Sequence, residues 1–179
     1  MYHRIVAGRV RATFAAINAG DWEPVIAGVA STFTYRFYGE HALSGERHTP
    51  AALRLWWQRA ERLLPGTNFQ VDDVLVAGWP WSTRVATRVT VDAGLPDGSR
   101  YGNVVMQFMR IRWGKITEVR TLEDTAVLTR ALDRLAAAGV AEAHAAPITD
   151  MAAAVPAAAT RPTPGRAARA DLGGSALDE

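Results

Sequence analysis

Four strand-like stretches follow one another in the second half of the chain, and they limit the possible folds more than any other feature. They are Phe69–Ala77, Trp81–Val91, Tyr101–Trp113 and Ile116–Leu122. Each is rich in β-branched and aromatic residues, which favour strands. The segments that separate them are short and carry turn residues, at Gly78, Leu95–Gly98 and Gly114–Lys115. Because consecutive strands joined by short turns pair side by side, the sequence predicts an antiparallel sheet.

The segments before this sheet have mainly helical patterns. Apolar residues at helical spacing predict a first helix over Ile5–Ile17, and a second, shorter helix follows over Asp21–Ala30 with the aspartate as its cap. The aromatic stretch Phe33–Tyr38 alternates in character and predicts a strand with Tyr35 and Phe37 on one face.

Two further helices are predicted. Thr49 caps and Pro50 opens a helix that ends at Pro65-Gly66, and its tryptophans are expected to cover the sheet. A last helix, Thr125–Ala138, has an apolar face and a plausible end at the following glycine. The whole pattern indicates one α+β domain.

The end of the chain differs in composition from the rest. Beyond Pro147 it consists mostly of Ala, Pro, Gly and Arg, with few large apolar residues to offset the entropy of ordering it. We therefore predict a folded domain over residues 1–147 and a disordered tail over residues 148–179.

Charge and cysteine content argue against several kinds of partner and site. The net charge is only +2, so nucleic acid is not an expected partner. The absence of cysteine excludes disulfides, thiolate zinc sites and cysteine nucleophiles. The four histidines lack the close spacing of metal ligands, and we expect neither a metal nor another cofactor. With no run of about eighteen apolar residues, a cytoplasmic protein without membrane attachment is expected.

The order of the elements over Ile5–Ala138 resembles the nuclear transport factor two-like superfamily, and especially its SnoaL-like branch, which includes polyketide cyclases. The motifs that carry the resemblance are Ala19-Gly20-Asp21, Leu43-Ser44-Gly45, Tyr101-Gly102-Asn103 and Gly114-Lys115-Ile116-Thr117-Glu118. The resemblance implies a curved antiparallel sheet wrapped around helices, as a cone-shaped barrel with an internal pocket. It does not imply one activity, because this fold carries isomerases, cyclases, dehydratases, hydrolases and binding domains.

Asp124 stands where SnoaL-type cyclases place a carboxylate that acts as general acid and base. A carboxylate among aromatic side chains loses hydration, so its pKa rises and it can exchange protons near neutral pH. Asp124 also precedes the helix that starts at Thr125, where an aspartate commonly serves as the N-cap. Both roles remain open from the sequence.

Other active sites of the superfamily are not matched. The positions of the catalytic tyrosine, base and acid of ketosteroid isomerases fall at Thr13, Phe37 and Met106 or Gln107. The Asp-Arg-Asp set of the epoxide hydrolases is also broken, because Thr90 follows Arg88 by two residues and Thr121 stands at the acid position on the last strand. Neither mechanism is therefore predicted.

The remaining candidates suit a pocket for a small, flat organic molecule, with apolar walls and a few polar groups. The expected ligand-binding residues are Tyr35, Phe37, Trp56, Trp57, Arg88, Asn103, Gln107 and Arg120. His41 and His48, in the loop before the third helix, could carry protons at neutral pH.

Two functions follow from these residues. One is an acid/base enzyme of cyclase or isomerase type that uses Asp124, and the other is a non-catalytic ligand-binding or dimerisation module. A homodimer is also expected, through apolar residues such as Trp79, Trp81 and Met109 on the outer face of the sheet.

Overall fold

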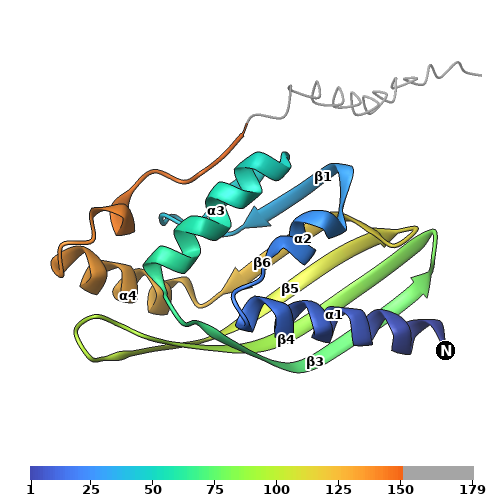
Figure 1. Cartoon of the computed structure of the whole chain (residues 1–179), viewed down its shortest axis with the longest axis horizontal. Coiled ribbons are helices and arrows are strands. Elements are labelled where there is room, and N and C mark those ends of the chain that lie inside the picture. Colours follow the sequence, from blue (N-terminus) through green and yellow to red (C-terminus); the bar gives the residue numbers. More distant parts are fainter. Residues whose placement is uncertain (151–179) are drawn as a thin grey trace, which may run out of the picture.

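A six-stranded sheet carries four α-helices in the computed structural model, which describes residues 1–150 (Figure 1). In chain order the elements are α1 (Tyr2–Asn18), α2 (Glu23–Gly28), β1 (Val29–Phe37), β2 (Gly45–Arg47), α3 (Pro50–Leu63), β3 (Asn68–Trp79), β4 (Ser82–Gly94), β5 (Arg100–Arg112), β6 (Lys115–Glu123), α4 (Thr125–Ala137) and the 3₁₀ turn η1 (Ala141–His144). The predicted α+β fold class is confirmed. Most of the predicted tail, from Met151 onward, lies outside the described residues.

The sheet has the strand order β2-β1-β6-β5-β4-β3. Strands β3 to β6 pair antiparallel in sequence order, as predicted. Strand β1 instead runs parallel to β6, with Tyr35 opposite Val119, and pairs with the short strand β2 on its other side. The sheet is curved but not closed, because β2 and β3 are free edges among the described residues.

Local sequence signals account for the element boundaries. The Thr49 Oγ1 accepts a hydrogen bond from the Ala52 amide at 3.2 Å, which caps α3. The turn between β5 and β6 has two residues in the left-handed region, Trp113 with φ 50° and Gly114 with φ 79°. Two such residues make a type I′ turn, whose twist suits a tight antiparallel hairpin.

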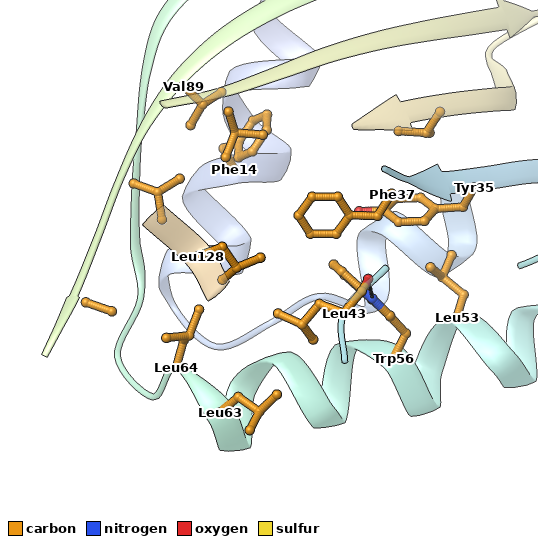
Figure 2. Close-up of a cluster of buried hydrophobic side chains, with 14 of the residues drawn as sticks. Phe14, Tyr35, Phe37, Leu43, Leu53, Trp56, Leu63, Leu64, Val89 and Leu128 are labelled. Atoms are coloured by element: carbon orange, nitrogen blue, oxygen red, sulfur yellow. Dashed lines mark hydrogen bonds between the residues drawn. The ribbon is translucent and has the colours of Figure 1, made fainter. Parts of the chain in front are cut away.

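The helices lie on one face of the sheet and cover different parts of it. Helix α1 lies along β3, where the rings of Phe14 and Phe69 are 5.9 Å apart, while α3 covers the β1 side (Figure 1). Figure 2 shows the core between them, in which Leu53, Leu63 and Leu128 are fully buried. We call the helix-covered face of the sheet the inner face and the opposite one the outer face.

After η1 the chain returns to strand β2. The Ile148 carbonyl accepts a hydrogen bond from Arg47 at 3.1 Å, and the Asp150 carboxylate accepts bonds from the amides of His48 at 2.6 Å and Thr49 at 2.7 Å. The predicted domain boundary after Pro147 falls inside this set of contacts. None of the helices in residues 1–150 has the length and apolarity needed to cross a membrane.

Candidate ligand cavity

A cavity of about 1010 Å³ lies between the inner face of the sheet and helices α1, α2 and α3. Its floor comes from β1, β4, β5 and β6, on which every second side chain points inward. Exposed residues such as Arg9 and Ala12 of α1 and Glu61 of α3 also line it, so the cavity opens to solvent between these two helices. This volume is at the upper end of the range for small-molecule sites.

Aromatic side chains form the wall on the α3 side (Figure 2). The Tyr35 ring lies 5.1 Å from Trp56, Phe37 lies 6.1 Å from it, and Trp56 meets Trp57 edge to face at 5.0 Å. The Trp56 Nε1 donates to the Leu43 carbonyl at 2.8 Å, which fixes the orientation of the indole. Such a wall offers flat apolar surfaces to a ring-shaped ligand.

Three polar side chains meet on the floor of the cavity. Gln107 of β5 and Thr121 of β6 are partners in the strand register, and the Gln107 Nε2 donates to the Thr121 Oγ1 at 3.1 Å. The Tyr35 hydroxyl neighbours Thr121, and burial raises the pKa of Tyr35, so this hydroxyl keeps its proton. The floor therefore carries hydrogen-bonding groups in an otherwise apolar space.

Glu123 is the carboxylic acid buried in this cavity. It follows Thr121 by two residues on the same face of β6, is 8% exposed and lines the cavity. Burial raises the pKa of Glu123 to about 7, although the Tyr101 hydroxyl, which donates to the Glu123 Oε2 at 2.8 Å, opposes this rise. A carboxyl group with this pKa is present in both protonation states near neutral pH.

Tyr101 is held by a further contact. The Asn103 Nδ2 donates to the Tyr101 hydroxyl at 3.2 Å and to the Asp124 carbonyl at 3.0 Å. Burial raises the pKa of Tyr101 and the charge of Glu123 raises it further, so Tyr101 stays a hydrogen-bond donor. These contacts fix the position of the Tyr101 hydroxyl that bonds to the Glu123 carboxyl group.

Asp124 has a different position from its neighbour. Its side chain is exposed, and its Oδ1 accepts hydrogen bonds from the amides of Ala126 at 3.0 Å and Val127 at 3.1 Å. It is therefore the N-cap of α4, and it is not among the residues that line the cavity. The capping role is thus observed, and the catalytic role of Asp124 stays a prediction.

The other predicted pocket residues divide according to the face on which they lie. The residues that line the cavity are Tyr35, Phe37, Trp56, Trp57 and Gln107. Asn103 lies behind Tyr101 and does not line it. Arg88 and Arg120 are on the outer face, where Arg88 pairs with Asp73 at 2.9 Å and Arg120 donates to the Tyr38 hydroxyl at 3.1 Å. Alternation explains this, because the adjacent residues Thr87 and Thr121 are buried.

The two loop histidines also lie outside the cavity lining. His41 is buried with its ring 5.2 Å from Phe37, and burial lowers its pKa. The His48 Nδ1 lies 3.2 Å from the Phe33 carbonyl oxygen, and its Nε2 lies 3.1 Å from the Glu46 Oε1. Within residues 1–150, no three or more His, Asp or Glu side chains are grouped as a metal ion would require.

The chain is similar in sequence to one known protein family and in structure to several solved proteins. A family model described as the SnoaL-like domain matches residues 10–119. The chain belongs to the SnoaL-like family. The matched region contains the aromatic wall and Gln107 but ends before Thr121 and Glu123. A comparison with curated protein sequences finds no significant match.

Solved structures share the fold of this SnoaL-like chain at low identity. PrhC from Penicillium brasilianum has a TM-score of 0.67 and 15% identity over 79% of this chain and 94% of its own. IdmH from Streptomyces antibioticus, described as a candidate polyketide cyclase, has a TM-score of 0.57 and 19% identity over 71% and 97%. TerC, crystallised with polyporic acid, has a TM-score of 0.60 and 16% identity over 69% and 95%. A structure described as an NTF2-like protein from Burkholderia pseudomallei has a TM-score of 0.61 and 17% identity over 68% of this chain and 92% of its own, so the chain has a nuclear transport factor two-like fold.

The raised pKa of Glu123 predicts how stability depends on pH. In the unfolded chain Glu123 has its ordinary pKa of 4.5, whereas in the folded protein its pKa is about 7. Between these values the folded state binds one proton more, so a rise in pH favours unfolding. From about pH 5 to about pH 8, the wild type should lose about 2 kcal/mol more unfolding free energy than Glu123→Gln.

Urea denaturation of both proteins at the two pH values measures this difference. Titration of other groups, such as His41, cancels in the comparison. Equal pH dependence of the wild type and Glu123→Gln would show that Glu123 ionises normally in the folded protein.

Proposed function

We propose that this SnoaL-like chain binds a small, largely apolar organic molecule with a carbonyl group and exchanges a proton with it through Glu123. The observation that carries the proposal is the one carboxyl group that is buried among residues 1–150, on the polar floor of an aromatic-walled cavity. A pKa of about 7 lets the same group act as base and then as acid. Cyclase or isomerase chemistry needs both actions in sequence.

The proposed reaction begins with the ionised form of Glu123. Its carboxylate removes a proton from the carbon next to the ligand carbonyl, and the released electron pair forms an enolate with its negative charge on oxygen. In an isomerisation, protonated Glu123 returns the proton to a different carbon. In a cyclisation, the enolate carbon bonds to a second carbonyl carbon, and the oxygen of that carbonyl takes the proton from Glu123.

The polar floor supports the charge that develops in this reaction. The Gln107 side-chain amide donates a hydrogen bond to the Thr121 hydroxyl oxygen. The Thr121 hydroxyl can in turn donate its own proton to the neighbouring Tyr35 oxygen. The Tyr35 proton is then free to bond to an enolate oxygen in the cavity. Donors fixed before the reaction stabilise developing charge more effectively than water does, because they need little reorganisation.

The structural neighbours agree with this class of ligand. IdmH is a candidate polyketide cyclase, and TerC was crystallised with polyporic acid. Their low identity to this chain leaves the substrate itself open, and the proposal rests on the cavity of this chain.

Ligand binding without chemistry is the second candidate function. It is favoured by the position of Asp124, since the residue at the acid/base position of SnoaL-type cyclases serves here as a helix cap. The same cavity would then hold an aromatic ligand through the wall of Tyr35, Phe37, Trp56 and Trp57.

Paired variants of two adjacent carboxylates test the catalytic proposal. Proton exchange at the carbon next to a carbonyl can be followed by NMR in deuterated water for a panel of small ketones and polyketide-like esters. Glu123→Gln should reduce the exchange rate by about a hundredfold or more, because the amide cannot accept the proton. Asp124→Asn should leave the rate and the melting temperature nearly unchanged, because asparagine caps a helix about as well as aspartate.

The opposite result would move the acid/base role to Asp124, as the sequence pattern predicts. If the wild type exchanges no proton but aromatic ligands raise its melting temperature, ligand binding alone is the function.

We also propose that the chain forms a homodimer through the outer face of the sheet. This face carries a band of exposed apolar side chains, Leu75, Met106, Phe108 and Leu122. Met109, predicted on this face, is buried and lines the cavity instead, because Phe108 takes the outward position of the alternation. Exposed apolar bands of this kind commonly mark an interface.

Charges on this face are paired within one copy, Arg110 with Glu118 and Arg88 with Asp73, both at 2.9 Å. A second copy could therefore cover the apolar band without leaving these charges unpaired.

Sedimentation of two charge-introducing variants tests the dimer. Phe108→Glu should weaken the dimer by about tenfold or more, because a carboxylate would be buried at the centre of the interface. Leu55→Glu is the control, because Leu55 is similarly exposed but lies on α3. A wild type that is monomeric at micromolar concentration, or equal dissociation of both variants, would contradict this interface.

A further inference from the structure

A fully buried guanidinium group lies beside the aromatic wall of the cavity. The side chain of Arg47, on β2, has no exposed surface. Its nitrogens donate to the carbonyls of Ser44 at 3.0 Å, Gly45 at 2.7 Å and Ile148 at 3.1 Å. Its Nε has no hydrogen-bond partner within residues 1–150, and no carboxylate of that region pairs with it directly. A buried cation bonded only to neutral groups is costly, which suggests a function for its charge.

The guanidinium lies directly behind two side chains that line the cavity. Its central carbon is 5.3 Å from the centre of the Tyr35 ring and 5.2 Å from that of Trp56. Both rings face the cavity, whereas Arg47 itself does not line it. Figure 2 shows these two rings close together in the buried cluster. The Tyr35 and Trp56 rings thus contact both the charge and the cavity, and aromatic rings screen a charge less than water does.

Other charged groups around Arg47 offset part of its charge. Glu46 and Asp150 lie near it, whereas the positive charge of Arg59 is itself paired with Glu142, with the Arg59 Nε 3.2 Å from the Glu142 Oε1. Burial lowers the pKa of Arg47 to about 10, so it remains a cation at neutral pH, and its charge lowers the pKa of Tyr35 against the effect of burial. On the cavity side the nearby acid is Glu123, which is neutral when protonated.

We propose that the cavity binds phenols and enols, and that Arg47, from behind the Tyr35 ring, stabilises their anionic forms against the cost of burial. Arg47 is in this sense a positioning residue that acts through Tyr35, whose hydroxyl would contact the ligand. The inference rests on the proposed function of the cavity and names the ligand class that it takes. An enolate formed through Glu123 also carries a negative oxygen, so Arg47 and Tyr35 would stabilise both a bound phenolate and this reaction intermediate.

Binding of a phenol and its methyl ether tests this inference. The neutral and anionic forms of 4-nitrophenol absorb at different wavelengths, so a pH titration gives the pKa of the bound phenol. In the wild type this pKa should be lower than in Arg47→Met, because the guanidinium offsets part of the cost of burying the anion. Arg47→Met should weaken the preference for the anion by about tenfold, and Arg47→Lys should retain most of it. 4-Nitroanisole, which cannot ionise, should bind the wild type and Arg47→Met with similar affinity.

Arg59→Met is the matched control for a purely structural role. Arg59 also holds the C-terminal segment, since it donates to the Ala42 carbonyl at 3.1 Å and the Ala146 carbonyl at 2.7 Å, but it does not stack on Tyr35. Its loss should lower the melting temperature without changing the pKa of bound 4-nitrophenol.

The outcomes separate this inference from the proposed function. If both compounds bind but the pKa of bound 4-nitrophenol is the same in the wild type and in Arg47→Met, the role of Arg47 is overturned while ligand binding stands. If neither compound binds, the proposed binding function fails together with this inference. If Arg47→Met does not fold, Arg47→Gln gives the same comparison.

Discussion

Side chains on the long strands β4, β5 and β6 alternate between the two faces of the sheet, and the position of each candidate functional group on them follows from that alternation. On β6, Val119, Thr121 and Glu123 point inward, whereas Arg120 and Leu122 point outward. One strand therefore supplies both the polar floor of the cavity and part of the proposed dimer face. Since a shift of one residue would exchange the two sets, the register of β6 is essential to the site.

A small number of polar groups in an apolar space gives the cavity its chemistry. Water would leave Glu123 ionised at neutral pH and would screen the charge of Arg47. Glu123 is nearly buried, so its pKa rises, and the guanidinium of Arg47 stacks on the Tyr35 ring at the cavity wall. Burial thus provides a proton carrier near neutral pH, and the proposed role of Arg47 is to offset part of the cost of a negative oxygen.

The sequence predicts much of the fold because its signals are local. Thr49-Pro50 marks the start of α3, and Gly114 marks the β5–β6 turn, in agreement with the structure. The parallel pairing of β1 with β6 joins residues about eighty positions apart and leaves no local signal. The extension of domain contacts to Asp150 depends equally on distant partners, His48 and Thr49.

For the site, residue type was a good guide only when it matched the face. Aromatic residues and Gln107 fall on the inner face, but Arg88 and Arg120, whose side chains suit a pocket only by their chemistry, point outward. The family pattern indicates Asp124 and not Glu123. The alternation that runs from Val119 through Thr121 does place Glu123 on the inner face.

A crystal structure of the chain with 4-nitrophenol bound is the most direct test of the cavity as a ligand site. We expect the ring against Phe37 and Trp57, and its oxygen within hydrogen-bonding distance of Tyr35 or Glu123. A cavity filled by rearranged side chains, or a phenol bound only on the outer face, would contradict the proposed site.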